Sequence, residues 1–482
     1  MEFKFDLSNL EEFLPKDLDA DKRLKAKTLF FKKLALAAHS FYGGKLTVLP
    51  KSGPMSSGWM NVWYTPGVSA VSTAIRDHEP KSYDLSSRGN RALVLSDGTR
   101  VLGDGDCGAA GGLGVMEGKA MLMKYLGGID ADAICINSRD GKGKPVFGKI
   151  VDFANMIAPS FGAINLEDIS QPNCYKVLDE LRRTCPIPVW HDDAQGTACV
   201  TCAALINALK LARKKINNIK IVLYGAGAAN STVAEFLMAM GADGGNIIIF
   251  DKSGALTKKR TDLKNDPDFY KQWSLCLRTN GANIKDEHSA FKNADVVIAL
   301  SKPGPGTIKS EWIKLMAPKA IVFACANPVP EISPEESLKA GAFIAASGRG
   351  DFPNQVNNSL CFPGILKAVL LCRARGITDT MALAAAKAIA KCAELKGINP
   401  KRILPDMYDG ELYPMQVKAV VEQARKEGLA GLEITPQEAY KKAKADIKAA
   451  RALSDALWRK GYIKKMPLTI IKKALRETLK EI

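Results

Sequence analysis

A glycine-rich turn near the middle of the 482-residue chain has the residue types that cradle a phosphate. The run Gly225-Ala226-Gly227-Ala228-Ala229-Asn230 follows the apolar segment 219–224 and precedes a helical pattern, and the next apolar segment ends in an acid, Asp251. In dinucleotide-binding folds, glycines let the backbone approach a pyrophosphate at a helix start, and such an acid receives the ribose hydroxyls. The pattern predicts cofactor contacts from Gly225, Gly227, Ala228, Ala229, Asn230 and Asp251. The alternative is a helix-start turn that binds nothing.

Two adjacent pairs of carboxylates suggest a second kind of chemistry. Glu167-Asp168 precede Asp192-Asp193 by 25 residues, and the second pair ends a strand-like segment. Hard divalent cations such as Mg²⁺ and Mn²⁺ prefer oxygen ligands, and three carboxylates with open positions for a substrate suit them. Spacing alone leaves open that these are solvated loop acids.

A lysine and a tyrosine are candidates for proton transfer. Lys119 follows a glycine-dense stretch, and Tyr64 lies in the run Trp63-Tyr64-Thr65-Pro66. A buried lysine can have its pKa lowered until it serves as a base near neutrality, and a phenol can donate a proton to carbon. The neighbouring sequence is equally compatible with a surface lysine and a packing tyrosine.

These residues need rigid elements to position them, and the hydrophobic pattern predicts which. Short apolar strands are expected at 60–65, 91–97, 133–137, 162–168 and 186–193, with helices at 22–39, 116–126, 148–158, 175–183 and 198–212. From residue 219 onward, short apolar strands alternate with helices, which is typical of a parallel sheet covered on both faces. Residues 378–395 and the region after 435 are expected to be helical.

Composition excludes several classes of protein. Hydrophobic residues make up 46% of the chain and charged residues 25%, as in an ordinary globular protein. No stretch reaches the roughly 20 apolar residues of a membrane span. The first forty residues mix acids and bases and resemble neither a secretion signal nor a transit peptide, so we expect a cytoplasmic protein. Eleven scattered cysteines, including the pair Cys199 and Cys202, indicate packing side chains rather than a disulfide framework.

The net charge of +17 is concentrated near the end of the chain. Residues 434–482 hold thirteen Lys and Arg against five Asp and Glu, a net of +8. Such a balance can attract a polyanion. Because no nucleic-acid motif accompanies it, we expect a solvated helical face or attraction for small anions, and no nucleic-acid partner.

The motifs together resemble those of a known family. "YTPGV", "SDGTRVLGDGD", "VMEGKA", "GGIDA", "APSFGAINLEDI", "HDDAQGTA", "GAGAAN", "FACANPVPEISPEE" and "GRGDFPNQVNNSLCFPGI" occur in this order over residues 35–430. In this order they resemble a malic enzyme of the compact type. The resemblance implies oxidative decarboxylation of L-malate to pyruvate and CO₂, with NAD⁺ or NADP⁺ and Mg²⁺ or Mn²⁺ as cofactors, in a homo-oligomer such as a homodimer or tetramer.

The resemblance also implies a role for individual residues. Lys119 would take the proton of the C2 hydroxyl, Tyr64 would protonate C3 of the enol, and Asp192 would orient the lysine. The remaining assignments are metal ligands Glu167, Asp168 and Asp193, and substrate contacts Arg100, Asn327 and Asn358.

Some positions depart from the family pattern. Asn230 stands where glycine or alanine is expected in the nucleotide turn, and Arg100 matches an arginine that compact members often lack. Asp251 favours NAD, whereas the nearby Lys252, Lys258, Lys259 and Arg260 could pair a phosphate or form a solvated loop, so the nucleotide stays open. A malolactic enzyme, which releases lactate, is the nearest alternative, and a non-catalytic basic binding protein is a more distant one.

The expected fold is α/β with a doubly wound nucleotide domain. We predict an N-terminal malate-binding α/β domain at 1–190, a Rossmann-type domain at 191–433 and a basic helical extension at 434–482. The site is expected in the cleft between the two domains, at the carboxyl ends of the strands, where such sheets bind ligands.

Overall fold

The computed structural model describes residues 7–482 and divides into two compact units. One unit combines the chain up to Leu49 with Ala452–Ile482. It contains η1 (Leu7–Phe13), α1 (Ala20–Tyr42), α19 (Leu468–Leu479) and the end of α18 (Pro436–Arg459). Phe30 and Leu34 of α1 pack with Leu475 of α19 in a small apolar core, which is what the amphipathic pattern predicts.

The larger unit, Pro50–Arg451, contains two parallel sheets. The first has the order β2-β1-β3-β4, with β1 at Arg91–Ser96, β2 at Asp130–Cys135, β3 at Ala163–Leu166 and β4 at Val189–His191. Its helices are α5 (Gly108–Gly127), α6 (Phe147–Ile157) and α7 (Asn173–Thr184). Strands β1, β3 and β4 are buried, which explains their mostly apolar sequences, whereas β2 at the edge is half-buried and contains two aspartates.

The second sheet has the order β10-β9-β8-β5-β6-β7. Its strands are β5 (Ile221–Tyr224), β6 (Ile247–Asp251), β7 (Gly254–Ala255), β8 (Val296–Ala299), β9 (Ile321–Ala324) and β10 (Ile344–Ser347), all parallel except β7. Its helices include α9 (Ala228–Ala239), α10 (Thr261–Lys264), α11 (Tyr270–Arg278), α12 (Glu287–Phe291), α13 (Ser310–Ile313) and α14 (Pro334–Lys339). The predicted strand–helix alternation after residue 219 is thus confirmed.

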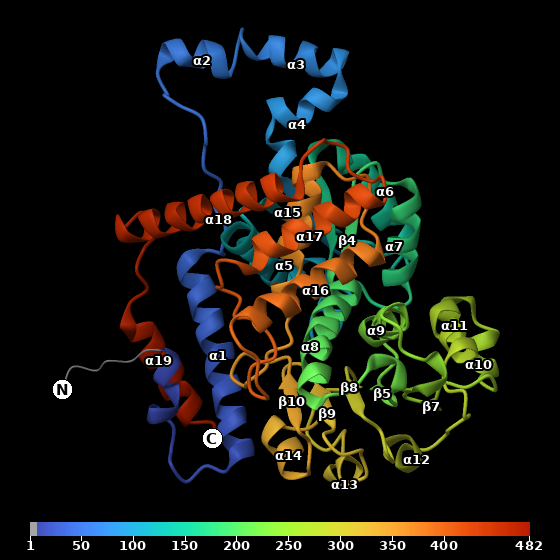
Figure 1. The fold of residues 1–482 in the computed structure, drawn as a ribbon. Coiled ribbons are helices and arrows are strands. Elements are labelled where there is room, and N and C mark those ends of the chain that lie inside the picture. The colour runs from blue at the N-terminus through green and yellow to red at the C-terminus, as the bar shows by residue number, and fades with distance from the viewer. Residues whose placement is uncertain (1–6) are drawn as a thin grey trace. The chain divides into compact units, whose positions relative to one another are not determined.

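A layer of long helices lies between and around the sheets (Figure 1). Helix α8 (Thr197–Ala212) packs against α9 and α16 (Asp379–Leu395), and α17 (Leu412–Lys426) packs against α15 (Phe362–Cys372). Cys199 and Cys202 are buried and unbridged in α8, so the prediction of packing cysteines is confirmed. No helix in the described part of the chain has the length and hydropathy required to cross a bilayer.

One predicted element is wrong. Residues 60–65 were expected to form a strand, but α2 covers Ser57–Trp63 and no strand pairs with it. A short apolar run does not distinguish a strand from a helix by periodicity. Helix α3 (Val68–Asp77) follows, and short turns α4 (Ser82–Leu85) and η3 (Ser87–Asn90) lead into β1.

Candidate active site

The carboxylates gather where two neighbouring strands end. Glu167 and Asp168 follow β3, and Asp193 lies in the π-helical turn Asp192–Gly196 that follows β4. Because β3 and β4 are parallel neighbours, both carboxyl ends reach the same edge of the sheet. One carboxylate oxygen from each of Glu167, Asp168 and Asp193 lies within 4.8 Å of the others. This is the size of a cluster that can hold one ion.

The surroundings of Asp168 indicate whether a divalent cation fits the carboxylate cluster. Its backbone amide donates to Oδ2 of Asp193 (2.7 Å), and its Oδ1 accepts from the amide of Leu102 (3.2 Å). Its Oδ2 is buried without a hydrogen-bond partner among the described residues. Burial, followed by the charge of Asp193, raises the pKa of Asp168 to about 7. A hard cation would neutralise this crowding and use the unpaired oxygen, so the donor set fits Mg²⁺ or Mn²⁺.

Lys119 projects from α5 into the same cluster and is buried. Its Nζ lies 2.9 Å from Oε1 of Glu167 and also forms an ion pair with Asp192. Indole Nε1 of Trp190 donates to the other oxygen of Asp192 (3.1 Å), which fixes this carboxylate. The amine thus lies in direct contact with one predicted metal ligand.

The electrostatics of Lys119 differ from the simplest expectation for a buried base. Burial by itself lowers the pKa of Lys119, but the negative charges of Asp192, Glu167 and Asp193 outweigh it and raise the pKa above its usual value. Burial raises the pKa of Glu167, although the charge of Lys119 opposes this. The amine and the carboxylates therefore form one buried, mutually compensating charge network.

The three predicted substrate contacts come from separate loops that converge near this cluster. The amide of Arg100 donates to the carbonyl of Asp168 (3.0 Å), and the arginine side chain is exposed. A Cβ added at Gly103, in the same loop, would lie 2.2 Å from the carbonyl oxygen of Asn327, so these two backbones touch. A Cβ added at Gly196 would lie 3.3 Å from Cβ of Asn358, which places that asparagine beside the Asp192 turn.

Tyr64 is the predicted catalytic residue that the structure does not bring to the cluster. It caps the end of α2, its side chain is 66% exposed, and no contact with Lys119 or the carboxylates is present among the described residues. Helices α2 and α3 stand away from α5 and the sheets (Figure 1).

The glycine turn at 225–230 is tight at its first residue and open at the start of α9. Gly225 has a φ of +102°, and an added Cβ would lie 2.5 Å from the carbonyl oxygen of Leu300, so only glycine fits. Gly227, at the start of α9, has no atom within 4 Å of an added Cβ. That open space next to a helix N-terminus, where Ala228 and Ala229 begin α9, suits a pyrophosphate.

Asn230 stabilises this turn through side-chain hydrogen bonds. It is buried, and its Nδ2 donates to the carbonyls of Tyr224 (3.1 Å), Gly225 (3.0 Å) and Ile298 (3.3 Å). The side chain therefore joins the ends of β5 and β8 to α9. Where glycine or alanine would allow close packing, asparagine bridges the gap with hydrogen bonds.

Asp251 ends β6 next to this turn and is already paired. Its two carboxylate oxygens accept from Nη1 (2.9 Å) and Nη2 (2.7 Å) of Arg260, which also binds Asp262. The sequence singled out both residues but not this bidentate pair, because the loop that returns Arg260 to the strand end cannot be derived from spacing.

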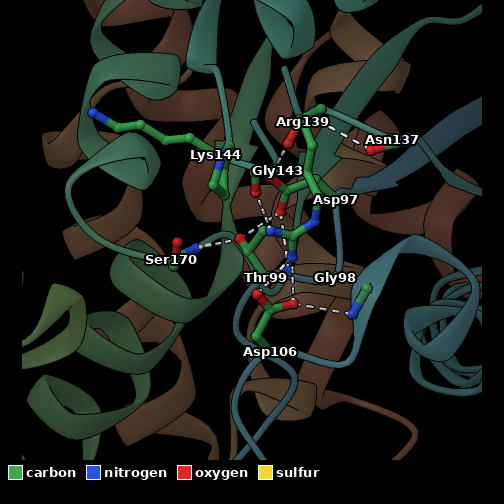
Figure 2. A network of polar contacts seen from close by, with 12 residues as sticks. Asp97, Gly98, Thr99, Asp106, Asn137, Arg139, Gly143, Lys144 and Ser170 are labelled. Carbon is green, nitrogen blue, oxygen red and sulfur yellow. Dashed lines mark hydrogen bonds and ion pairs between the residues drawn. The ribbon is translucent and has the colours of Figure 1, made fainter. Parts of the chain in front are cut away.

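A polar network supports the loop that carries Arg100 and Leu102 (Figure 2). Oδ1 of Asp97 accepts from the amide (3.1 Å) and hydroxyl (2.6 Å) of Thr99, whose oxygen accepts from the amide of Ser170 (2.9 Å). Arg139 binds Asp106 and the carbonyl of Gly143 (2.7 Å). The network ties the loops after β1, β2 and β3 together around Asp168.

Sequence reasoning missed one buried acid near this edge. Glu331 accepts from the amides of Ser301 (2.7 Å) and Ala326 (3.0 Å), which follow β8 and β9. Burial raises its pKa, while these hydrogen bonds oppose the shift. Its place after the Asn327-Pro328 segment was the available signal, and it holds in place the loop that carries Asn327.

Comparison with known proteins identifies related chains. A family model described as "Malic enzyme, N-terminal domain" matches residues 54–182, and one described as "Malic enzyme, NAD binding domain" matches residues 194–425. An NAD-dependent malic enzyme of Geobacillus stearothermophilus is 42% identical over 83% of this chain and 80% of its own length. A bifunctional malic/malolactic enzyme of Bacillus subtilis (strain 168) is 38% identical over 85% of this chain and 96% of its own.

Solved structures agree with these matches. The crystal structure of Entamoeba histolytica malic enzyme is similar with a TM-score of 0.96 and 51% identity, over 98% of each chain. That of malic enzyme from Pyrococcus horikoshii has a TM-score of 0.79 and 41% identity, over 90% of this chain and 96% of the other.

Proposed function

Because this chain belongs to the malic enzyme family, a family of oxidoreductases, we propose that it converts L-malate to pyruvate and CO₂ in a reaction that depends on a divalent cation and reduces NAD⁺ or NADP⁺. The observation that carries the proposal is the contact of Lys119 with Glu167 and Asp192, inside the carboxylate cluster at the edge of the first sheet.

The carboxylates supply a place for the cation. Glu167, Asp168 and Asp193 would hold Mg²⁺ or Mn²⁺. When bound, the cation would polarise the C2 oxygen of malate, and the nucleotide would take up the two electrons of the oxidation. Part of the negative charge around Lys119 would then be neutralised, so its pKa would fall toward the range of a useful base.

Lys119 and Tyr64 divide the proton transfers. Lys119 accepts the proton of the C2 hydroxyl, and Asp192, fixed by Trp190, holds the amine in position. After the C3–C4 bond breaks and CO₂ leaves, Tyr64 donates a proton to C3 of the enol, which gives pyruvate. A positioned acid or base of this kind contributes roughly 10²–10⁴-fold to the rate.

The remaining site residues would bind malate and the nucleotide. Arg100 offers a cation for one malate carboxylate beside Asp168, and Asn327 and Asn358 offer amides from neighbouring loops. Gly225, Gly227, Ala228 and Ala229 would hold the pyrophosphate, Asp251 would bind the ribose, and Asn230 keeps that turn in shape. We propose that the malate-binding domain spans residues 1–190, the Rossmann-type domain 191–433 and the basic helical extension 434–482.

The malolactic reaction is the second candidate, because the Bacillus subtilis relative is named bifunctional. Both are tested by supplying L-malate and Mn²⁺ with each nucleotide in turn, following reduced nicotinamide and assaying pyruvate against lactate. Equal amounts of reduced nucleotide and pyruvate are expected. Lactate without net reduction would favour the second candidate, and no product from malate would contradict both.

A further inference from the structure

His191 is a buried histidine that takes no part in the proposed proton transfers. It ends β4, directly before Asp192 and Asp193, and none of its surface is exposed. Neither Nδ1 nor Nε2 has a hydrogen-bond partner among the described residues. A buried polar atom that forms no hydrogen bond costs stability, so two such atoms on one ring indicate that the imidazole gains a partner in another state of the molecule.

The ring lies next to one of the predicted metal ligands. Nδ1 of His191 is 3.9 Å from Oδ2 of Asp193, which is just too far for a hydrogen bond. Trp190 and Asp192 have the same spacing of two residues, and there the ring nitrogen does donate to the carboxylate, at 3.1 Å. The end of β4 thus places a ring nitrogen beside each of two consecutive acids, and only the bond to Asp193 is not formed.

His191 has little freedom to reach a different partner. Its backbone pairs with Leu166 of β3, and its amide donates to Oε1 of Gln195 (3.1 Å). Nε2 of that glutamine donates to Asp379 of α16 (3.2 Å), which fixes the end of β4 from a second side. The side chain of Asp193, by contrast, is 34% exposed and can adjust. The carboxylate is therefore the group that would move to close the distance of 3.9 Å.

The imidazole lies outside the ligand set itself. One oxygen from each of Glu167, Asp168 and Asp193 lies within 4.8 Å of the others, and in the described part of the chain no histidine nitrogen belongs to that group. Oδ2 of Asp193 already accepts from the amide of Asp168 (2.7 Å). A second donor to this oxygen would fix the plane of the carboxylate and leave Oδ1 for the cation. Hydrogen bonds to a ligating carboxylate orient it in this way.

We propose that His191 is a positioning residue, whose Nδ1–H donates to Oδ2 of Asp193 when a divalent cation binds and so orients this ligand. The inference rests on the cation site of the proposed function, but it does not depend on the identity of the substrate. His191 touches neither the cation nor malate in this arrangement. Its contribution is to cation affinity, and loss of such an outer partner weakens metal binding about 10–100-fold.

Two substitutions separate a hydrogen bond from packing. His191→Asn keeps a nitrogen bonded to Cγ, as Nδ1 is, but leaves part of the ring volume unfilled, whereas His191→Phe fills the volume and has no donor. Calorimetry with Mn²⁺ alone should show affinity at least about tenfold weaker for His191→Phe, and within about threefold of wild type for His191→Asn. Packing alone predicts the reverse order. That order, or wild-type affinity in His191→Phe, would overturn the proposal.

Stability in the presence of a chelator is the matched control. Because His191→Phe replaces two ring nitrogens that have no partner among the described residues, it should unfold at the same denaturant concentration as wild type or at a higher one. Weaker Mn²⁺ binding by this variant then reports the lost donor rather than a damaged fold.

The ring itself gives a readout in the wild-type protein. The chain has four histidines, and His191 is the buried one, so comparison with His191→Asn assigns its ¹⁵N ring resonances. Saturating Mg²⁺ should shift the Nδ1 resonance as expected for a new hydrogen bond to a carboxylate. An unchanged Nδ1 resonance, or direct coordination of Mn²⁺ by the ring in pulsed EPR, would overturn the proposal even if His191→Phe fails to fold.

Turnover separates this inference from the proposed function. A protein that binds Mn²⁺ with the expected order of affinities but does not act on malate would keep the role of His191 and refute only the proposed function. If malate is oxidised with Mn²⁺ while His191→Phe binds the cation as the wild type does, the function stands and the role of His191 is refuted.

Discussion

Asp168 combines three features that are typical of a residue in a functional site. Its backbone has a left-handed φ of +53°, its Oδ2 is buried without a partner among the described residues, and its pKa is raised by burial. Strained backbone and unpaired buried oxygen both cost stability, and they persist where function requires them. The loop network around Asp97 and Thr99 supplies the rigidity that maintains this arrangement.

Substitution of this oxygen tests the cation site directly. Asp168→Asn should weaken Mn²⁺ binding at least about tenfold, because a charged oxygen ligand is replaced by a neutral amide. Isothermal calorimetry with Mn²⁺ alone measures this without turnover. Asp152→Asn, on the exposed surface of α6, should bind as the wild type does. Equal affinity of both variants would place the cation elsewhere.

The ion pair of Asp251 and Arg260 should influence the preference between NAD⁺ and NADP⁺. Arg260 neutralises Asp251, so the repulsion of a ribose 2′-phosphate is reduced. Arg260→Ala should free the carboxylate and lower the ratio of kcat/KM for NADP⁺ to that for NAD⁺ by about tenfold, or ~1.4 kcal/mol. Lys259→Ala removes a neighbouring charge without breaking the pair and should change the ratio less. An unchanged or higher ratio in Arg260→Ala would contradict this account.

At the scale of elements, Asn230 holds together the ends of β5 and β8 and the start of α9. Asn230→Ala removes three hydrogen bonds of a buried side chain and leaves carbonyls without that donor, so the free energy of unfolding should fall by about 2 kcal/mol. Denaturant unfolding measures this, with the exposed Asn217→Ala as control, expected within ~0.5 kcal/mol of wild type. Unchanged stability with weaker nucleotide binding would instead make Asn230 a ligand contact.

A buried lysine joins α15 to α18. Nζ of Lys367 lies 2.7 Å from Oδ2 of Asp446 and donates to Oδ1 of Asn90 (2.8 Å). Burial lowers the pKa of Lys367, although Asp446 opposes this. The side chain of Asp446 is 36% exposed, so solvent screens part of the attraction.

Removal of the Asp446 carboxylate should therefore lower the free energy of unfolding by an amount that depends on pH. Asp446→Asn leaves a buried ammonium and should lower the free energy of unfolding by about 2 kcal/mol at neutral pH. Because the lysine pKa in the folded state would lie still further below its unfolded value, stability should recover as rising pH removes the proton. Asp455→Asn, an exposed change on the same helix, should show neither effect in denaturant unfolding at two pH values. A loss that grows with pH would contradict this reasoning.

At the scale of the whole molecule, the site draws on loops that are distant in the chain. Asn327 meets the loop of Gly103, and Asn358 meets the turn of Gly196, so residues about 160 to 225 positions apart in the sequence surround one cluster. Tyr64 is the exception, because it lies exposed at the end of α2.

The sequence by itself determined the family and the parallel sheet after residue 219, and it predicted the candidate residues of the site. Buried strands, helix periods and a glycine turn are local patterns, so each is visible in consecutive residues. It was wrong about residues 60–65, whose short apolar run fits a helix as well as a strand. The charge state of Lys119, the pairing of Asp251 with Arg260 and the separation of Tyr64 from the cluster were decided only by tertiary structure. These properties depend on burial and on contacts across long stretches of chain, and spacing along the sequence records neither.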